Sequence, residues 1–358
     1  MTKKVLHVQF HEDVHSIYRS SVDTVILTLM PEFKSYIPVV ASVSYNNRVE
    51  RDDLQVTFYT FTEDKLINRV FNKILNIGVF TFSRLPSIIN NERPNIVHFH
   101  NRHNLVDRTI GRLKYLPKVV CHYHRHFKEL NIPNSCNIIL TVSENMKNYI
   151  LTKTNSQIPI RVSYNPIPFD LLSMQVREKM EVSYNEPTII YVGGSAHHKG
   201  FQDLMSTVEL LDIENIPYKL LLAGTGLNKE NFTSPKIEVL GLLPHNKVLE
   251  HIMGADIFVH PAHIEPFGIA VLEAMYLKKL IVATHVDGLK EFLNNDNSIK
   301  VNPKDPKNLY KGMIKAFTLL SKHRDSANEL QQKAFEDSKM FHPSLISRNL
   351  ENLYDELL

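Results

Sequence analysis

Cysteine and long apolar runs are scarce in this sequence of 358 residues, and each absence excludes a class of protein. Two cysteines, Cys121 and Cys136, cannot make a disulfide framework and fit a reducing compartment. No stretch of about 18 apolar residues is present, so the sequence predicts no membrane span. The apolar run VLHVQF after Lys4 is too short for a signal-peptide core and is typical of a first strand. We therefore expect a cytoplasmic protein.

An excess of charge of one sign is also missing. The net charge of +3 and the sequence pI of about 8.6 are too weakly basic to predict a nucleic-acid partner. A small basic patch that faces anionic lipid or phosphate is still compatible with this balance. Hydrophobic residues make up 43% and charged residues 22%, which is typical of a globular protein with a sizeable core.

Short apolar runs rich in Val, Ile and Leu alternate with helical patterns along almost the whole chain. Such continuous runs are typical of parallel strands that helices cover on both faces. The alternation predicts an α/β protein with doubly wound sheets. The expected strands are residues 5–10, 56–60, 96–99, 118–122, 138–142, 188–192, 218–223, 237–240, 257–260 and 280–284.

The strand–helix alternation pauses once, near the middle of the chain. Asn165-Pro166-Ile167-Pro168 precedes a polar stretch, and a new strand follows Glu186-Pro187. Proline disfavours helix in the residue before it and gathers in linkers. We place the domains at 1–170 and 171–340, with an amphipathic helix over 341–358 that we expect to pack back on the first domain.

Segment 65–90 has apolar residues at near-helical spacing, interrupted by Lys65, Arg69 and Lys73. One interpretation is a basic amphipathic helix that lies on a membrane, which would give peripheral contact with the inner membrane face. The other is a helix that covers the first sheet. We favour the second, because every helix that buries one face shows this pattern.

The stretch HIEPFGIAVLEAMYLKKLIVATHVDGLKEF, residues 263–292, is the most informative in the sequence. Glu265 and Glu273 lie eight positions apart, and Pro266-Phe267-Gly268 predicts a turn between a strand and a helix that begins near Ile269. Unpaired N–H groups at such a helix start can bind a pyrophosphate, and Gly268 allows close approach of the backbone. The simpler interpretation of two glutamates near a helix start is favourable interaction with the helix dipole.

This stretch resembles the E-x7-E signature of glycosyltransferase family 4, written EPFGxxxLEAM. The resemblance implies a GT-B fold, in which two Rossmann-like domains bind substrates in the cleft between them. It also implies a nucleotide-diphosphate sugar as donor, with a UDP-sugar favoured over GDP- or ADP-sugars, retention of anomeric configuration, and no requirement for a metal or cofactor. The second domain would bind the donor and the first the acceptor.

Neighbouring stretches extend the resemblance over about residues 190–295. YVGGSAHHKGFQDLM would place Lys199 on the donor diphosphate, and LLLAGTG would place Gly224 in a turn beside the nucleotide. Leu243 would contact the base, and Gly288 and Glu291 match a GxxE segment. The implied donor-binding residues are Gly194, Lys199, Gly224, Leu243, Glu265, Phe267, Gly268, Ile269, Ala270 and Glu273.

The sequence departs from the family pattern at two places. Gly194 stands where the family has an arginine that shares the diphosphate with the lysine, and no glycine-rich loop occurs between positions 5 and 20. These departures keep open an inactive relative that serves as a scaffold or binding partner. A further alternative is an isomerase on the same fold, such as a nucleotide-sugar epimerase, although the E-x7-E context argues against it.

Histidines gather at the ends of two expected strands, in VHFHNRH and CHYHRH. Strand alternation puts His98 and His100 on one face, and His122, His124 and His126 on one face, where parallel strands deliver residues to a crevice. Zinc ligands, catalytic groups and hydrogen-bonded core histidines all fit this pattern. Zinc needs three or four converging ligands, which a sequence does not show.

The resemblance favours a catalytic role for the second of these strand ends. His124 aligns with the family histidine that reaches the donor sugar, so the implied catalytic residues are His124, Lys199 and Glu265, without a metal. His11, His15 and His100 are the expected acceptor-binding residues. The implied reaction is a hexosyl transfer to a glycan, lipid-linked or other hydroxyl acceptor in cell-surface polysaccharide biosynthesis, and the oligomeric state stays open.

Overall fold

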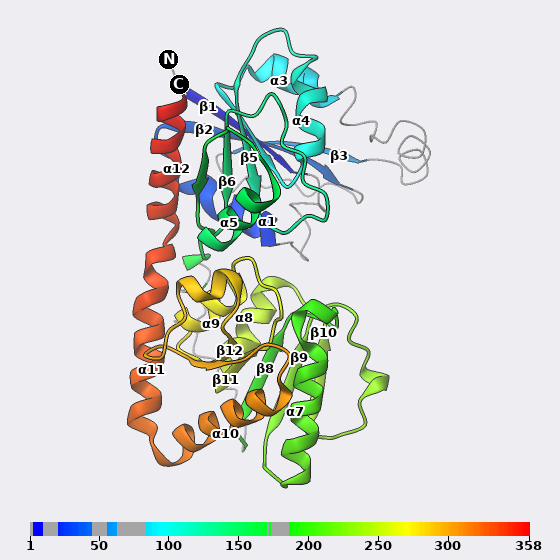
Figure 1. The fold of residues 1–358 in the computed structure, drawn as a ribbon, viewed down its shortest axis with the longest axis vertical. Helices are drawn as coiled ribbons and strands as arrows, with labels where there is room; N and C mark the ends of the chain where they lie inside the picture. Colours follow the sequence, from blue (N-terminus) through cyan, green and yellow to red (C-terminus); the bar gives the residue numbers. More distant parts are fainter. Residues whose placement is uncertain (1–2, 10–20, 45–55, 63–83, 170–171, 173–185) are drawn as a thin grey trace. The chain divides into compact units, whose positions relative to one another are not determined.

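The computed structural model describes residues 3–9, 21–44, 56–62, 84–169, 172 and 186–358, which form two compact units (Figure 1). Unit 1 comprises Met1–Pro166 and Pro343–Leu358, and unit 2 comprises Ile167–His342. The sequence had suggested divisions after residues 170 and 340. Each unit is a parallel sheet with helices on both faces, so the predicted α/β class with two Rossmann-like domains is confirmed.

Unit 1 contains a seven-stranded parallel sheet in the order β3-β2-β1-β4-β5-β6-β7. The direction in which strands are added reverses between β1 and β4, and this reversal is the topological switch point where open α/β sheets bind ligands. The strands are β1 (Lys3–Gln9), β2 (Tyr36–Ser44), β3 (Thr57–Thr62), β4 (Ile96–His100), β5 (Lys118–Tyr123), β6 (Ile138–Thr141) and β7 (Ile160–Val162).

Strand β2 was not expected from the sequence, because proline cannot donate to a strand ladder and argues against a central strand. Pro38 nevertheless lies in β2, paired with Val5 of β1. Pairing with β3 begins only one residue later, at Val39 and Thr57. Pro38 therefore sits where β2 has a neighbour on one side only, and such an edge position is where a strand tolerates proline.

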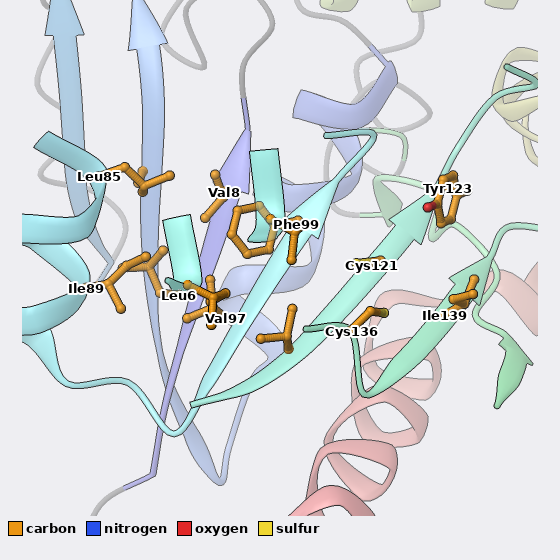
Figure 2. Packing of buried hydrophobic residues seen from close by; sticks show 14 of the residues in the cluster. Leu6, Val8, Leu85, Ile89, Val97, Phe99, Cys121, Tyr123, Cys136 and Ile139 are labelled. Carbon is orange, nitrogen blue, oxygen red and sulfur yellow. The ribbon is translucent and has the colours of Figure 1, made fainter. Parts of the chain in front are cut away.

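One face of the unit 1 sheet is apolar and packs on three helices: α3 (Leu85–Glu92), α4 (His103–Ile110) and α5 (Glu144–Lys153). Figure 2 shows Leu85 and Ile89 of α3 beside Leu6 and Val8 of β1. All four side chains are fully buried. Burial of each aliphatic side chain of this size contributes about 1.5–3 kcal/mol, so this face forms the hydrophobic core.

The opposite face of the same sheet packs on α1 (Ser21–Leu29) and α12 (Pro343–Leu357). The Glu351 carboxylate of α12 accepts the backbone N–H groups of Lys34, Ser35 and Tyr36 at 2.9, 2.7 and 3.2 Å. Asp355 of the same helix accepts hydrogen bonds from the Lys3 ammonium and the Tyr36 hydroxyl, each at 2.6 Å. These bonds hold α12 on unit 1, to which it belongs despite its distance along the chain.

Unit 2 contains a six-stranded parallel sheet in the order β10-β9-β8-β11-β12-β13. Its switch point lies between β8 and β11, which pair through Ile257 and Ile189. The strands are β8 (Thr188–Val192), β9 (Lys219–Ala223), β10 (Ile237–Gly241), β11 (Ile257–His260), β12 (Leu280–Thr284) and β13 (Ile299–Val301). Strands β8, β11 and β12 have the bounds that the sequence predicted.

Among residues 186–342, five helices lie around this sheet. Helices α7 (Phe201–Ile213) and α10 (Pro306–Lys322) pack on one face, in a core that includes Leu204 and Met313. Helices α8 (His245–Gly254), α9 (Ile269–Tyr276) and α11 (Arg324–Ser338) are in contact with the strands or one another elsewhere in unit 2. Asp305 is the N-cap of α10, and its carboxylate accepts a hydrogen bond from the N–H of Asn308 at 3.0 Å.

The two interpretations of segment 65–90 can be tested only at its end. Helix α3 packs its buried Leu85, Ile88 and Ile89 on the sheet, as a covering helix does. The more basic part, up to residue 83, lies outside the described residues. Within the described part of the chain, every helix is too short or too polar to cross a bilayer.

Candidate functional site

The two loops that leave the strands at the switch point of unit 2 are joined by backbone hydrogen bonds. The loop after β8 contains the short helix η3 (His197–Lys199). The His198 carbonyl accepts the N–H groups of His263 and Ile264 from the loop after β11, at 2.8 and 3.3 Å. The His263 ring is also 2.8 Å from the Asp203 carboxylate of α7. These contacts fix the positions of the two loops relative to each other and to the sheet.

Each loop contributes one member of an ion pair. The Lys199 ammonium lies 2.8 Å from the Glu265 carboxylate, and the same carboxylate oxygen is 3.2 Å from Nε2 of His260 at the end of β11. Only 8% of Glu265 is exposed. Two residues that the sequence singled out from separate motifs, Lys199 and Glu265, are therefore in direct contact.

The protonation state of Glu265 follows from this environment. Burial alone would raise the pKa of its carboxyl, but the Lys199 charge and the hydrogen bond with His260 outweigh burial and hold the pKa well below its usual range. Glu265 is therefore ionised at neutral pH. Because the ammonium of Lys199 has three N–H donors, its contact with Glu265 leaves donors that can face an anionic ligand.

The backbone of Glu265 is clamped by the segment after β12. The Asp287 carboxylate accepts the Glu265 N–H at 2.9 Å, and the Gly288 N–H donates to the Glu265 carbonyl at 3.1 Å. Asp287 has φ of 38°, a left-handed conformation that a side chain makes unfavourable. Strained backbone at such a position is typical of a segment held in place for function.

Helix α9 begins immediately after this loop, without a side-chain cap. Gly268 precedes it with φ of 98°, and a Cβ there would lie 2.4 Å from the Leu289 side chain, so glycine is required. The first hydrogen bond of the helix joins Val271 N to the Gly268 carbonyl at 3.0 Å, so the N–H groups of Ile269 and Ala270 precede the helical ladder. These two N–H groups can donate hydrogen bonds to an anion.

Phe267 has a different place from the one that its position in the motif suggests. Its side chain is 3% exposed and packs on Phe292 and Phe341, with ring centroids 5.9 and 5.5 Å away. It therefore anchors the loop in the core of unit 2. Contact of Phe267 with a ligand would have to use its backbone.

Glu273 lies one helical turn further along α9 and is 3% exposed. Its carboxylate is 2.7 Å from Nε2 of His245, the first residue of α8. Leu243 precedes α8 by two residues and is half-buried. The start of α8 thus brings Leu243 and His245 to the same side of the sheet as Glu273, although the sequence assigned no role to His245.

Gly194 and Gly224 bring the loops after β8 and β9 into direct contact. Gly194 has φ of 90°, and a Cβ there would lie 2.5 Å from the Thr225 carbonyl oxygen. A Cβ on Gly224 would lie 2.4 Å from the Gly194 nitrogen. The Ser195 N–H donates to the Thr225 carbonyl at 3.0 Å. Gly194 is thus required by the packing of this chain, which explains why no side chain occupies the position of the family arginine.

In unit 1 the switch point carries histidines in place of charged residues. Register pairs His7 of β1 with His98 of β4, and His100 of β4 with His122 of β5. His124 follows on the same face, just after β5. We call His7, His98, His100, His122 and His124 the histidine cluster. Except for the half-buried His124, none is more than 3% exposed.

Hydrogen bonds connect part of this cluster. Nδ1 of His7 is 3.0 Å from Nε2 of His100, and Nδ1 of His100 is 2.9 Å from Nε2 of His124. Nδ1 of His98 is 2.6 Å from the Tyr354 hydroxyl of α12. Burial lowers the pKa of His7 and of His124 to about 3, although the neighbouring Asn165 raises the pKa of His124 slightly. Burial also lowers the pKa values of the other three, so the cluster is uncharged at neutral pH.

Of the remaining expected histidines, the structure places His126 away from the histidine cluster. The prediction that His126 shares the face of His122 is wrong, because β5 ends at Tyr123 and strand alternation stops there. The His126 ring instead lies 4.3 Å from the Tyr149 ring of α5, on the apolar side of the sheet. His11 and His15 lie outside the described residues. His100 is in the histidine cluster.

Sequence reasoning missed three residues that touch the expected ones. His260 and Asp287 hold Glu265, and His245 contacts Glu273. His260 had a usable signal, since it ends a predicted strand and so points into the switch-point region. The other two pair across unrelated elements, and one sequence carries no signal for such pairing.

Comparison with known proteins finds two adjoining families along the chain. Residues 37–171 match the family described as Glycosyltransferase Family 4, and residues 175–336 match Glycosyl transferases group 1. An uncharacterised glycosyltransferase of Methanocaldococcus jannaschii is 30% identical over 202 residues, which are 51% of each protein. A putative teichuronic acid biosynthesis glycosyltransferase of Bacillus subtilis, TuaC, is 26% identical over 130 residues, 36% of this chain and 33% of that protein. These matches span about half or less of the relatives' lengths.

A solved structure extends the similarity of fold to nearly every residue. The structure of HepE from Anabaena in complex with UDP and glucose has a TM-score of 0.74 to this chain, with 13% identity, over 99% of this chain and all of that one. Such a likeness establishes the fold alone. One glycosyltransferase family model matches most of unit 1 and another most of unit 2, so this chain is a family 4-type glycosyltransferase, and its two Rossmann-like domains have the GT-B fold.

Proposed function

We propose that this protein is an active retaining glycosyltransferase that moves a hexosyl group from a nucleotide-diphosphate sugar to a hydroxyl acceptor. The observation that carries the proposal is the contact of Lys199 with Glu265 at the switch point of unit 2. A cation, an ionised carboxylate and an uncapped helix start that converge there suit a ligand with both phosphate and sugar parts. Unit 2 is the donor-binding domain in this proposal, and unit 1 the acceptor-binding domain.

The diphosphate would bind to Lys199 and to the N–H groups of Ile269 and Ala270. As the bond between the anomeric carbon and the phosphate oxygen breaks, negative charge grows on the diphosphate. The ammonium and the two amides stabilise that charge without moving, and such preorganised stabilisation is usually the largest catalytic contribution. The acceptor hydroxyl attacks the anomeric carbon from the same face, and its proton passes to the leaving phosphate oxygen.

The two glutamates would bind hydroxyl groups. Glu273, whose carboxylate His245 orients at 2.7 Å, accepts hydrogen bonds from the ribose. Glu265 accepts hydrogen bonds from the donor sugar while it positions Lys199. Gly194 and Gly224 keep the nearby loops low enough for the nucleotide, and Leu243 contacts the base. The side chain of Phe267 takes no part beyond anchoring its loop.

Roles in unit 1 rest on the family resemblance. His124 orients the donor sugar, and His100 contributes to acceptor binding. UDP is the favoured nucleotide, since HepE has been solved with UDP and glucose. A relative named for teichuronic acid biosynthesis supports a glycan or lipid-linked acceptor in cell-surface polysaccharide synthesis, at the cytoplasmic side of the membrane. No metal or cofactor has a role in this reaction as proposed.

A thermal-shift panel of the full chain would test the donor site first. UDP, GDP, ADP, CMP and dTDP are each added alone and with a common sugar attached. A ligand at 100 times its dissociation constant stabilises the folded state by about 2.7 kcal/mol, which raises the melting temperature. We expect UDP and its sugars to give the largest shift. Glu273→Ala should remove the shift, and Glu238→Ala, which breaks the surface pair with Lys219, should keep it.

The panel also separates the alternatives. No shift with any nucleotide in the wild type would support the inactive relative, in which Gly194 in place of the family arginine leaves too little positive charge. Consumption of a bound donor sugar into its epimer, without acceptor, would support the isomerase. A shift that survives Glu273→Ala would reject the assigned donor site.

A further inference from the structure

His122 is a buried side chain with an unexplained shortage of partners. It is 3% exposed, and within the described part of the chain neither ring nitrogen makes a hydrogen bond of ordinary length and angle, although a backbone contact with Ser163 acts to raise its pKa. A neutral imidazole carries one N–H donor and one lone pair, and each costs about 1–3 kcal/mol if it is buried unsatisfied. Such a group in a native protein calls for a partner of another kind.

The neighbours of His122 are themselves good metal ligands. One ligand atom from each of His100, His122 and His124 lies within 4.8 Å of the other two. Nδ1 of His100 and Nε2 of His124 are 2.9 Å apart, and the rings of His122 and His124 have centroids 4.0 Å apart. Tetrahedral zinc with Zn–N bonds of about 2.0–2.1 Å holds its ligand nitrogens about 3.3 Å from one another. Small ring rotations would therefore bring the three nitrogens to this separation.

Contacts around these histidines match those of a built metal site. If His100 binds through Nδ1, its Nε2 still faces Nδ1 of His7 at 3.0 Å, which fixes its orientation. The Asn101 side chain accepts the backbone N–H of His124 at 2.8 Å and holds the end of β5. Outer contacts of this kind orient ligating histidines in metalloproteins.

Without a metal, a hydrogen bond would explain the short distance between His100 and His124, and stacking would explain the close packing of the neutral rings. Neither accounts for His122, whose ring nitrogens have at most the backbone contact with Ser163. A second group of three, His7, His98 and His100, also has converging nitrogens. Its first two members are completely buried, however, whereas His124 is half-buried and gives an ion a route to the outer group.

We propose that His100, His122 and His124 bind a divalent transition-metal ion such as Zn²⁺. Imidazole nitrogen suits zinc, cobalt, nickel and copper, and three protein ligands leave a fourth position for water or a hydroxyl group of a ligand. The ion takes Nε2 of His124, the residue to which the proposed transfer assigns the donor sugar. Bound metal therefore inhibits that transfer, and the site gives the protein a sensitivity to metal that the transfer itself does not need.

Direct binding tests this site without reference to activity. The full chain, without a histidine tag, is treated with EDTA, dialysed and titrated with Co²⁺ under visible absorption and with Zn²⁺ in a calorimeter. We expect one ion per chain and the intense absorption of four-coordinate Co²⁺. His122→Gln should weaken binding by more than ~100-fold, since loss of an outer contact alone costs 10–100-fold. His103→Gln is the matched control, because its ring packs on Tyr123 outside the group and should not change binding.

Other outcomes would overturn the proposal. Absence of stoichiometric Co²⁺ binding by the wild type would do so, as would full affinity in a folded His122→Gln variant, with folding checked by circular dichroism. Binding lost in His7→Gln but kept in His122→Gln would place the ion in the inner group and reject the assignment. If His122→Gln fails to fold, zinc-edge X-ray absorption of the wild type decides, because the proposal requires three imidazole ligands. The donor panel is run in EDTA, so either proposal can fail without the other.

Discussion

In unit 2 the strands at the switch point, β8 and β11, lead into loops that carry Lys199 and Glu265. In unit 1 the equivalent strands, β1 and β4, carry His7 and His100 within the strands themselves. The first set is ionised and internally paired, whereas the second is uncharged and partly unsatisfied. One strand order therefore supports two opposite kinds of site, and the side chains at the strand ends decide which one forms.

The difference also shows how each site is held. Loops position the charged pair of unit 2, and they depend on glycines and on Asp287 for their shape. The sheet itself positions the histidine cluster, because register alone sets His100 beside His122. Substitutions in the loops of unit 2 should thus change the geometry of its charged pair locally. Protonation of the histidine cluster should lower the stability of unit 1 as a whole.

Lowering the pH should produce the largest difference between the free energies of unfolding of the two units. The pKa of His7 and of His124 is lowered to about 3, so below about pH 6.5 the unfolded chain binds protons that folded unit 1 does not. The part of the stability of unit 1 that depends on these two neutral histidines is fully present above that pH. It decreases as the pH falls toward 3, by up to about 1.4 kcal/mol per pH unit for each histidine. In unit 2 the contribution of Glu265, whose folded pKa is depressed, is complete above about pH 4.3 and is lost only below it.

Hydrogen exchange resolved by peptide, in EDTA and corrected for intrinsic rates, measures this separation between pH 7 and 4.5. We expect unit 1 to lose protection first, and His7→Gln to reduce the slope of its stability with pH. The exposed His323, replaced by Gln, serves as the control. Loss of protection in unit 2 before unit 1 would contradict the assigned protonation states.

Lys199→Ala should lower turnover by about 10²–10³-fold, the usual effect of removing one group that stabilises transition-state charge. Nucleotide affinity should fall less, because Glu273 and the start of α9 remain. Steady-state kinetics with the donor identified in the nucleotide panel would separate kcat from KM. Lys247→Ala, which breaks a surface pair with Glu250 on α8, is the control. Wild-type turnover in Lys199→Ala would remove Lys199 from the catalytic site.

Gly194→Ala should destabilise unit 2 by about 2–4 kcal/mol, because it combines left-handed backbone with a Cβ 2.5 Å from the Thr225 carbonyl oxygen. Gly241→Ala is the matched control: its φ of 68° is similarly unfavourable, but no atom lies within 4 Å of the new Cβ. It should cost about 1 kcal/mol. Denaturant unfolding measures both. Equal losses of unfolding free energy in the two variants would mean that the contact between the two loops contributes nothing to stability. Gly194→Arg could then be expected to add a cation to the donor site without disrupting the fold.

Tyr354→Phe should have the smallest effect, about 1–2 kcal/mol on the unfolding of unit 1. It leaves Nδ1 of His98 without the hydroxyl that now lies 2.6 Å away, in a completely buried setting. Tyr310→Phe on α10, which loses a hydrogen bond to Glu214 near the surface, should change stability less. Equal melting temperatures for the two variants would show that α12 does not support the histidine cluster through this bond.

The sequence predicted much of the fold because parallel strands buried on both faces are marked by continuous apolar runs. Strands β8, β11 and β12 were predicted with their observed bounds for this reason. The three-residue strands β7 and β13 were missed, since runs so short do not stand out. Strand β2 was missed because Pro38 argues against a strand, and only the late start of pairing with β3 makes it tolerable.

The candidate site was predictable where a motif is local. Glu265, Gly268 and Glu273 occur within one short run, and Lys199 occurs in another. Their contact partners His245 and Asp287 come from separate elements that only the folded chain brings together. The histidines were predicted as two strand-end sets, but their pairing across β4 and β5, and the exclusion of His126, depend on register and on where β5 ends.

The place of α12 in unit 1 has a consequence for folding during synthesis. A ribosome completes the sheet of unit 1 early but releases α12 only after the whole of unit 2, on the order of ten seconds later at ~5–20 residues per second. Until then the face that carries the histidine cluster lacks the helix that covers it. That interval leaves a docking place open to α12 of a neighbouring nascent chain, so crowded polysomes are where exchange of this helix between copies would arise.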